Sequence, residues 1–157
     1  RAGNVIGGGD FSKNRLLPDI IRAINSNKKL KIRNPNYIRP WQHVLDPLIG
    51  YLTLAKIQYV KNINNNNEFA WNFGPSKNNF KKVFEVVEYV QKLEKFKYSF
   101  DKKKKFHETT TLKLDSAKAK RKLNWKSKWD LSVALKNTVE WNRSVKKKMC
   151  PEKKCVQ

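Results

Sequence analysis

The first fifteen residues constrain the fold more than any other part of the sequence. Apolar residues up to Ile6 are typical of the end of a buried strand, and Gly7-Gly-Gly9 then precedes a helix-like pattern from Leu16. A strand followed by a glycine-rich loop and a helix is typical of α/β proteins, whose ligands bind at the carboxyl ends of strands. We therefore expect the loop to border a ligand cleft. Because this unit opens the sequence without a Met or a polar lead-in, we also expect a carboxy-terminal fragment of a longer enzyme.

The glycine run does not match a dinucleotide-binding fingerprint. In the pattern G-x-G-x-x-G, the third glycine would fall at Ser12, and no acidic residue ends a second strand about twenty residues further on. A flexible loop over a cleft is the better interpretation.

Apolar periodicity and turn residues predict the remaining elements. We expect helices where apolar residues recur at helical spacing, at 16–25, 46–59, 79–95, 115–123 and 130–146. Asp46, Asp115 and Asp130 precede three of these helices and are predicted to cap them. Strands or extended segments are expected at 1–6, 30–33, 39–44, 69–73, 98–100 and 112–114. The fold class is therefore α/β with mixed strand pairing.

The chain is strongly basic, with 35 Lys and Arg against 13 Asp and Glu and a net charge of +22. Such a charge is also typical of RNA- or membrane-surface-binding modules, and that alternative stays open. The lysines fall mostly on polar helix faces and in short runs, without a nucleic-acid motif, so a solvated surface is favoured. A basic rim would also steer an anionic small substrate into a cleft. Cys150 and Cys155 lack other metal-ligand residues at suitable spacing, and we expect no metal site.

Few residues have a pattern that suggests chemistry. Arg39, on an extended segment beside Trp41, is suited to bind a phosphate, although a surface arginine next to a core tryptophan fits equally well. Asn72 ends a predicted strand and His107 lies in a loop, where either side chain could face a ligand or solvent. Tyr98 and Lys102 have the spacing of a catalytic Tyr/Lys pair, but no helical periodicity surrounds them, so the match is interpreted as accidental. We find no complete catalytic apparatus.

Several motifs in order resemble the carboxy-terminal half of the CDP-glucose 4,6-dehydratases, which are extended short-chain dehydrogenase/reductases of the NAD-dependent epimerase/dehydratase superfamily. The motifs are Arg1-Ala-Gly-Asn-Val-Ile-Gly-Gly-Gly-Asp10, Arg15-Leu-Leu-Pro-Asp19, Ile32-Arg-Asn-Pro35, Arg39-Pro-Trp-Gln-His-Val44, Trp71-Asn-Phe-Gly-Pro75, Leu112-Lys-Leu-Asp115, Leu123-Asn-Trp125 and Trp129-Asp-Leu131. The resemblance extends to about Asn142. It implies the carboxy-terminal part of a Rossmann-like fold, with a small, mixed substrate-binding lobe.

The resemblance also implies an activity for the parent enzyme. Bound NAD would oxidise the sugar at C4, water would leave across C5 and C6, and the hydride would return to C6, which converts CDP-glucose to CDP-4-keto-6-deoxyglucose, a precursor of deoxysugars in polysaccharides. The NAD motif and the catalytic Tyr-x-x-x-Lys of the family would precede Arg1, so we expect the fragment to be inactive alone. The substrate-binding residues implied by the resemblance are Asn4, Arg15, Leu16, Lys31, Arg33, Arg39, Asn72 and His107.

The same resemblance implies how the chain is divided into parts and what it binds. We expect residues 1–145 to form the substrate-binding part and residues 146–157 to be a disordered basic tail. The expected partner is a nucleotide sugar rather than a nucleic acid. The parent enzyme would be a cytoplasmic homo-oligomer. The alternative function is that of another nucleotide-sugar epimerase or dehydratase. One departure is Thr109-Thr-Thr111, where related enzymes place a basic or aromatic residue.

Overall fold

A computed structural model describes residues 1–61, 70–101 and 109–147. The elements follow the chain as β1 (Asn4–Ile6), α1 (Leu16–Ser26), β2 (Leu30–Ile32), β3 (Ile38–His43), α2 (Leu45–Lys61), the 3-10 turn η1 (Lys77–Asn79), β4 (Phe80–Lys82), α3 (Val83–Leu93), β5 (Tyr98–Phe100), α4 (Ala117–Leu123) and α5 (Leu131–Lys146). The predicted α/β class is confirmed, and most elements lie where periodicity placed them.

The strands form two small sheets. In the first, the order is β1-β3-β4, with β1 parallel and β4 antiparallel to β3. In the second, β2 and β5 pair in parallel, with Lys31 opposite Ser99. The predicted mixed pairing is therefore present.

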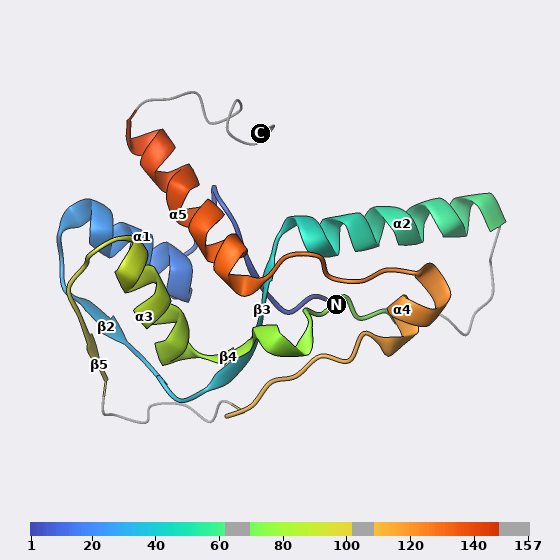
Figure 1. Cartoon of the computed structure of the whole chain (residues 1–157), viewed down its shortest axis with the longest axis horizontal. Coiled ribbons are helices and arrows are strands. Elements are labelled where there is room, and N and C mark those ends of the chain that lie inside the picture. Colours follow the sequence, from blue (N-terminus) through green and yellow to red (C-terminus); the bar gives the residue numbers. More distant parts are fainter. Residues whose placement is uncertain (62–69, 102–108, 148–157) are drawn as a thin grey trace.

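Two apolar clusters hold the helices to these sheets. The larger one lies among α1, α3, α5 and the strands, and it includes Ile20, Val87 and Leu135, which have almost no exposed surface. The smaller one joins α4 to α2, where the rings of Phe73 and Trp125 meet edge to face with centroids 5.1 Å apart. Figure 1 shows this division: α2 and α4 lie at one end of the molecule, and α1, α3, β2 and β5 lie at the other.

Two predicted elements were wrong in part. The helix expected from residue 79 begins only at Val83, because Phe80–Lys82 pairs with β3 and the Lys82 N–H donates to the Glu85 carboxylate at 2.7 Å, which starts the helix there. The strand expected at 69–73 is reduced, in its described part, to one parallel bridge between Ala2 and Phe73.

The three predicted aspartate caps have different roles. Asp130 immediately precedes α5 but makes no capping hydrogen bond with its side chain. The Asp115 carboxylate accepts a hydrogen bond from the Ala117 N–H at 2.8 Å. Asp115 lies one residue before Ser116, which is the N-cap residue of α4. Asp46 lies inside α2, which begins at Leu45, so its prediction as the cap was wrong. None of the helices in the described ranges is long and apolar enough to cross a membrane.

Candidate functional site

One cleft gathers most of the residues that the sequence singled out. It has a volume of about 320 Å³ and lies among β1, the loop that follows it, the start of α1, β2 and β3. Six of the eight predicted substrate-binding residues line it, namely Asn4, Arg15, Leu16, Lys31, Arg33 and Arg39. They come from four separate elements, so the fold brings together side chains that are up to 35 positions apart.

The glycine run forms the turn at one side of this cleft. Gly7 lines the cleft, and the Val44 N–H donates to the Ile6 carbonyl at 2.9 Å just before the turn. At Gly8, a Cβ atom would lie 2.3 Å from the ring of Trp141, and Gly9 has a φ of +79°. The backbone can therefore make this turn against α5 only because these positions lack side chains.

The loop after the glycines carries an acidic residue and a basic residue to the cleft. The Asp10 carboxylate accepts a hydrogen bond from the Ser12 N–H at 3.0 Å and pairs with the Arg15 guanidinium at 3.1 Å. Burial alone would raise the pKa of Asp10, but the Ser12 hydrogen bonds and Arg15 together lower it below the ordinary value of 3.8. Asp10 is therefore ionised at neutral pH and holds Arg15 at the edge of the cleft.

Strand β2 and the residue that follows it contribute two further cations, Lys31 and Arg33. Lys31 lies 3.9 Å from the Asp101 carboxylate, which follows β5. Asn34 turns the chain after β2 in a left-handed conformation with a φ of 48° and accepts a hydrogen bond from the Tyr37 N–H at 3.0 Å through its carbonyl. This turn places Arg33 and Tyr37 along the same cleft.

Arg39, on β3, also lines the cleft. Its guanidinium donates to the Thr109 carbonyl at 2.9 Å and lies over the ring of Tyr37, 5.2 Å from the ring centroid. The neighbouring Trp41 is 4% exposed, and its ring N–H donates to the Lys81 carbonyl, so it is a core residue that lines the floor of the cleft. The expected core position of Trp41 is confirmed, and Arg39 lines the cleft, while its predicted role in phosphate binding stays a prediction.

The outcomes differ for the other candidate residues. Asn72 is not among the residues that line the cleft, and His107 lies outside the described residues. Tyr98 is in strand β5, packed beside Phe96 and Phe100, rather than on the helix that a catalytic Tyr/Lys pair requires. Within the described part of the chain, no group of three or more His, Cys, Asp or Glu side chains is placed to hold a metal ion.

His43 has a structural environment. Its imidazole stacks on the indole of Trp129 with ring centroids 4.1 Å apart and planes within 7° of each other. Burial lowers the pKa of His43 below 6.5, and the nearby Asp46 carboxylate opposes this only in part. The neutral ring is therefore favoured at physiological pH.

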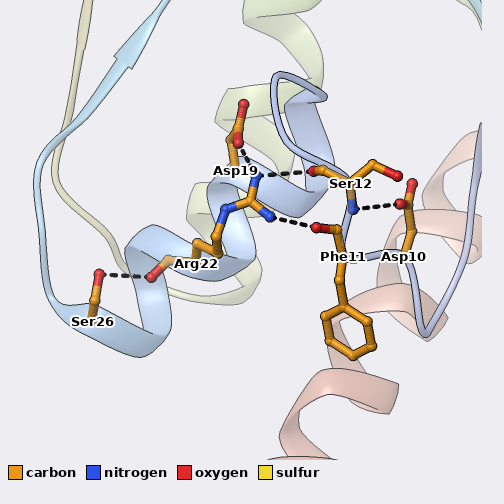
Figure 2. Close-up of polar contacts among 6 residues, drawn as sticks. All are labelled: Asp10, Phe11, Ser12, Asp19, Arg22 and Ser26. Carbon is orange, nitrogen blue, oxygen red and sulfur yellow. Dashed lines mark hydrogen bonds and ion pairs between the residues drawn. The ribbon is translucent and has the colours of Figure 1, made fainter.

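The sequence analysis did not predict the contacts of two polar residues, since Asp46 was expected only as a helix cap and Arg22 was not singled out. Asp46 is 2% exposed, and its carboxylate accepts hydrogen bonds from the Ser127 hydroxyl at 2.7 Å and the Lys128 N–H at 3.0 Å. Arg22 binds two carbonyl groups of the loop beside the cleft (Figure 2). In both cases the partners lie in irregular segments, and no local sequence pattern reports such contacts.

Comparison with known proteins shows which sequence and which folds the chain is similar to. No protein-family model matches it. It is 42% identical over 146 residues to CDP-glucose 4,6-dehydratase from Salmonella typhimurium. The aligned region covers 92% of this chain and 40% of that protein. The chain therefore spans less than half the length of this relative.

Solved structures show the same fold. UDP-glucose-4-epimerase from Stenotrophomonas maltophila, with bound NAD and formylated UDP-arabinopyranose, matches with a TM-score of 0.77 at 15% identity, over 94% of this chain and 48% of that one. UDP-glucuronic acid 4-epimerase from Bacillus cereus, in complex with UDP-glucuronic acid and NAD, matches with a TM-score of 0.73 at 16% identity, over 92% and 44%. UDP-glucose 4-epimerase from Thermotoga maritima matches with a TM-score of 0.67 at 21% identity, over 92% and 45%.

These matches define the class first: the fold is that of the carboxy-terminal part of the Rossmann-like NAD-dependent epimerase/dehydratase enzymes. Within that class, the chain is a relative of CDP-glucose 4,6-dehydratase, as the 42% identity over nearly its whole length shows. The resemblance found in the ordered motifs is confirmed.

Proposed function

We propose that this chain is the substrate-binding part of a CDP-glucose 4,6-dehydratase, which binds the nucleotide sugar in the cleft between α1, β2 and β3. The observation that supports the proposal is the convergence of four cationic side chains, Arg15, Lys31, Arg33 and Arg39, on one cleft. A nucleotide sugar carries its negative charge on a diphosphate, which guanidinium groups bind with paired, charge-assisted hydrogen bonds.

The cleft also offers surfaces for the uncharged parts of such a ligand. Its lining includes apolar side chains of α1 and β2 and the ring of Tyr37. Ligand sites of this kind combine an apolar lining with a few fixed polar groups. Two acidic residues, Asp10 and Asp19, lie in the same lining, and each pairs with an arginine, so the cationic groups are in excess.

The glycine turn does not fit the dinucleotide-binding fingerprint. The glycine turn places Gly8 against Trp141 rather than open to a pyrophosphate, and Ser12 stands where the fingerprint needs glycine. In the proposed parent enzyme, NAD and the catalytic residues would therefore belong to the part of the relatives that this chain does not cover. The role proposed for this chain is to bind and orient the nucleotide sugar, and the fragment is expected to be inactive alone.

Calorimetric titration of the chain with CDP-glucose tests the proposed substrate binding. Binding that weakens by about 2 kcal/mol, or about thirtyfold, in Arg39→Ala would support the proposal. Arg121→Ala is the matched control, because Arg121 is exposed on α4, away from the cleft. An unchanged affinity in Arg39→Ala would remove Arg39 from the site, and the absence of any CDP-glucose binding would contradict the proposed function for this chain.

UDP-glucose is the informative second ligand, because three matched structures are of enzymes named for UDP-sugars. Tighter binding of UDP-glucose than of CDP-glucose would favour the alternative, another nucleotide-sugar epimerase or dehydratase.

A further inference from the structure

Arg22 lies on α1 and is not among the residues that line the cleft, yet it contacts the loop that borders it. One terminal nitrogen of its guanidinium donates to the Phe11 carbonyl at 3.0 Å, and the other donates to the Ser12 carbonyl at 3.0 Å. Figure 2 shows the planar group between the helix and the loop, with both nitrogens directed at the loop backbone. A single side chain thus binds two consecutive carbonyl groups, as the fork of donors in arginine allows.

The guanidinium is also held from the helix side. It forms an ion pair with Asp19, three residues earlier on the same helix face, and Asp19 itself lines the cleft. Residues three and four positions apart on a helix lie side by side, so Asp19 fixes the direction in which Arg22 points.

Few other contacts hold this loop. Residues 11–14 are exposed, and the Phe11 side chain is 73% exposed, with its ring centroid 6.4 Å from that of Trp141. The loop belongs to no strand or helix. Hydrophobic burial therefore contributes little to its position, and the hydrogen bonds from Arg22 are the contacts that join it to α1.

The contacts continue from the loop to the cleft. The Ser12 N–H donates to the Asp10 carboxylate, and Asp10 in turn pairs with Arg15. Asp10 and Arg15 both line the cleft. An unbroken series of polar contacts thus connects Arg22 with the two charged residues at this edge of the site.

We infer that Arg22 is a positioning residue: its hold on the Phe11 and Ser12 carbonyls fixes the loop so that Asp10 and Arg15 stay at the edge of the cleft. The effect of Arg22 on ligand affinity rests on the proposed function, because this effect requires that the cleft binds a nucleotide sugar through Arg15. The position of the loop itself does not depend on that assumption.

The first test needs no ligand. Arg22→Lys keeps the positive charge but not the fork, Arg22→Gln removes both, and Arg121→Gln on α4 is a control for loss of charge. In both Arg22 variants, hydrogen exchange at the Ser12 amide should become about tenfold faster. The pKa of Asp10, followed by NMR, should rise towards its ordinary value, because the Ser12 hydrogen bond that lowers it is weakened. Unchanged exchange and an unchanged Asp10 titration in Arg22→Lys would overturn the inference.

The second test uses CDP-glucose as the probe. Affinity should fall about tenfold in Arg22→Gln and should not be fully restored in Arg22→Lys, whereas Arg121→Gln should match the unaltered chain. Unaltered binding in Arg22→Gln would show that Arg22 does not act on the site. If the unaltered chain binds no CDP-glucose, the proposed function fails, and the Ser12 and Asp10 measurements alone decide the inference.

Discussion

Replacement of Asp46 by alanine is expected to destabilise the fold far more than replacement of either of the other aspartates next to a helix start. The Asp46 carboxylate is buried and accepts hydrogen bonds from the Ser127 hydroxyl at 2.7 Å, the Lys128 N–H at 3.0 Å and the Trp129 N–H at 3.3 Å. A hydrogen bond to a charged group contributes about 1.5 kcal/mol at the low end. If the two shorter bonds each contribute this amount and the longest nothing, Asp46→Ala lowers the free energy of unfolding by about 3 kcal/mol.

The matched controls are Asp115→Ala and Asp130→Ala. Asp115 is exposed and accepts one hydrogen bond, from the Ala117 N–H, so its loss should cost about 1 kcal/mol. Asp130 makes no capping hydrogen bond with its side chain, so the change should stay within about 0.5 kcal/mol. Urea denaturation followed by tryptophan fluorescence measures all three. If Asp46→Ala costs no more than Asp115→Ala, the buried carboxylate does not hold residues 127–129 in the way described.

Two further predictions concern His43 and helix α2. Because burial lowers the pKa of His43 in the folded chain, the unfolded state binds more protons, so stability should decrease as the pH falls below 6.5. Urea midpoints between about pH 7.5 and 5.5 should show this slope, and His43→Gln should reduce it; an equal slope in the variant would assign the effect to other groups. On α2, Leu52 and Val60 are 71% and 70% exposed, so the double change to lysine should reduce self-association in light scattering while stability stays within about 0.5 kcal/mol. A loss well above that would mean that these side chains are packed in solution.

Much of the fold could be predicted because apolar side chains recur at the period of the element that buries them. The helix expected at 130–146 is present as α5, and the apolar residues Leu131, Ala134 and Leu135 are buried on it. The same reasoning failed at Phe80, whose position fits the helical pattern of α3. It instead lies in β4, because pairing with β3 competes with the helix and involves a partner 40 positions away.

The site was predictable only in part, for a related reason. Arg15 and Arg39 could be selected because both belong to recognisable motifs, one directly before a helix and the other in a strand. Asp46 also stood out, but as a helix cap, because its real partners lie 81 to 83 positions away. Arg22 binds backbone carbonyls of a loop, and a carbonyl acceptor carries no sequence signature.

The charged residues of the cleft also distinguish binding of a nucleotide sugar in the cleft from binding of anions over the whole basic surface. Among the Lys and Arg residues in the described ranges, four line the cleft, and three of these have polar partners in Asp10, Asp101 and the Thr109 carbonyl. A cation whose direction is already fixed loses little side-chain entropy when a phosphate binds, whereas exposed lysines attract anions mainly through long-range fields that salt screens. Binding through the whole basic surface, as in an RNA- or membrane-binding module, would weaken steeply with salt in proportion to the number of contacts. Binding in the cleft engages few phosphates, so CDP-glucose affinity should fall with salt much less steeply than the affinity of this chain for a nucleic acid of any sequence.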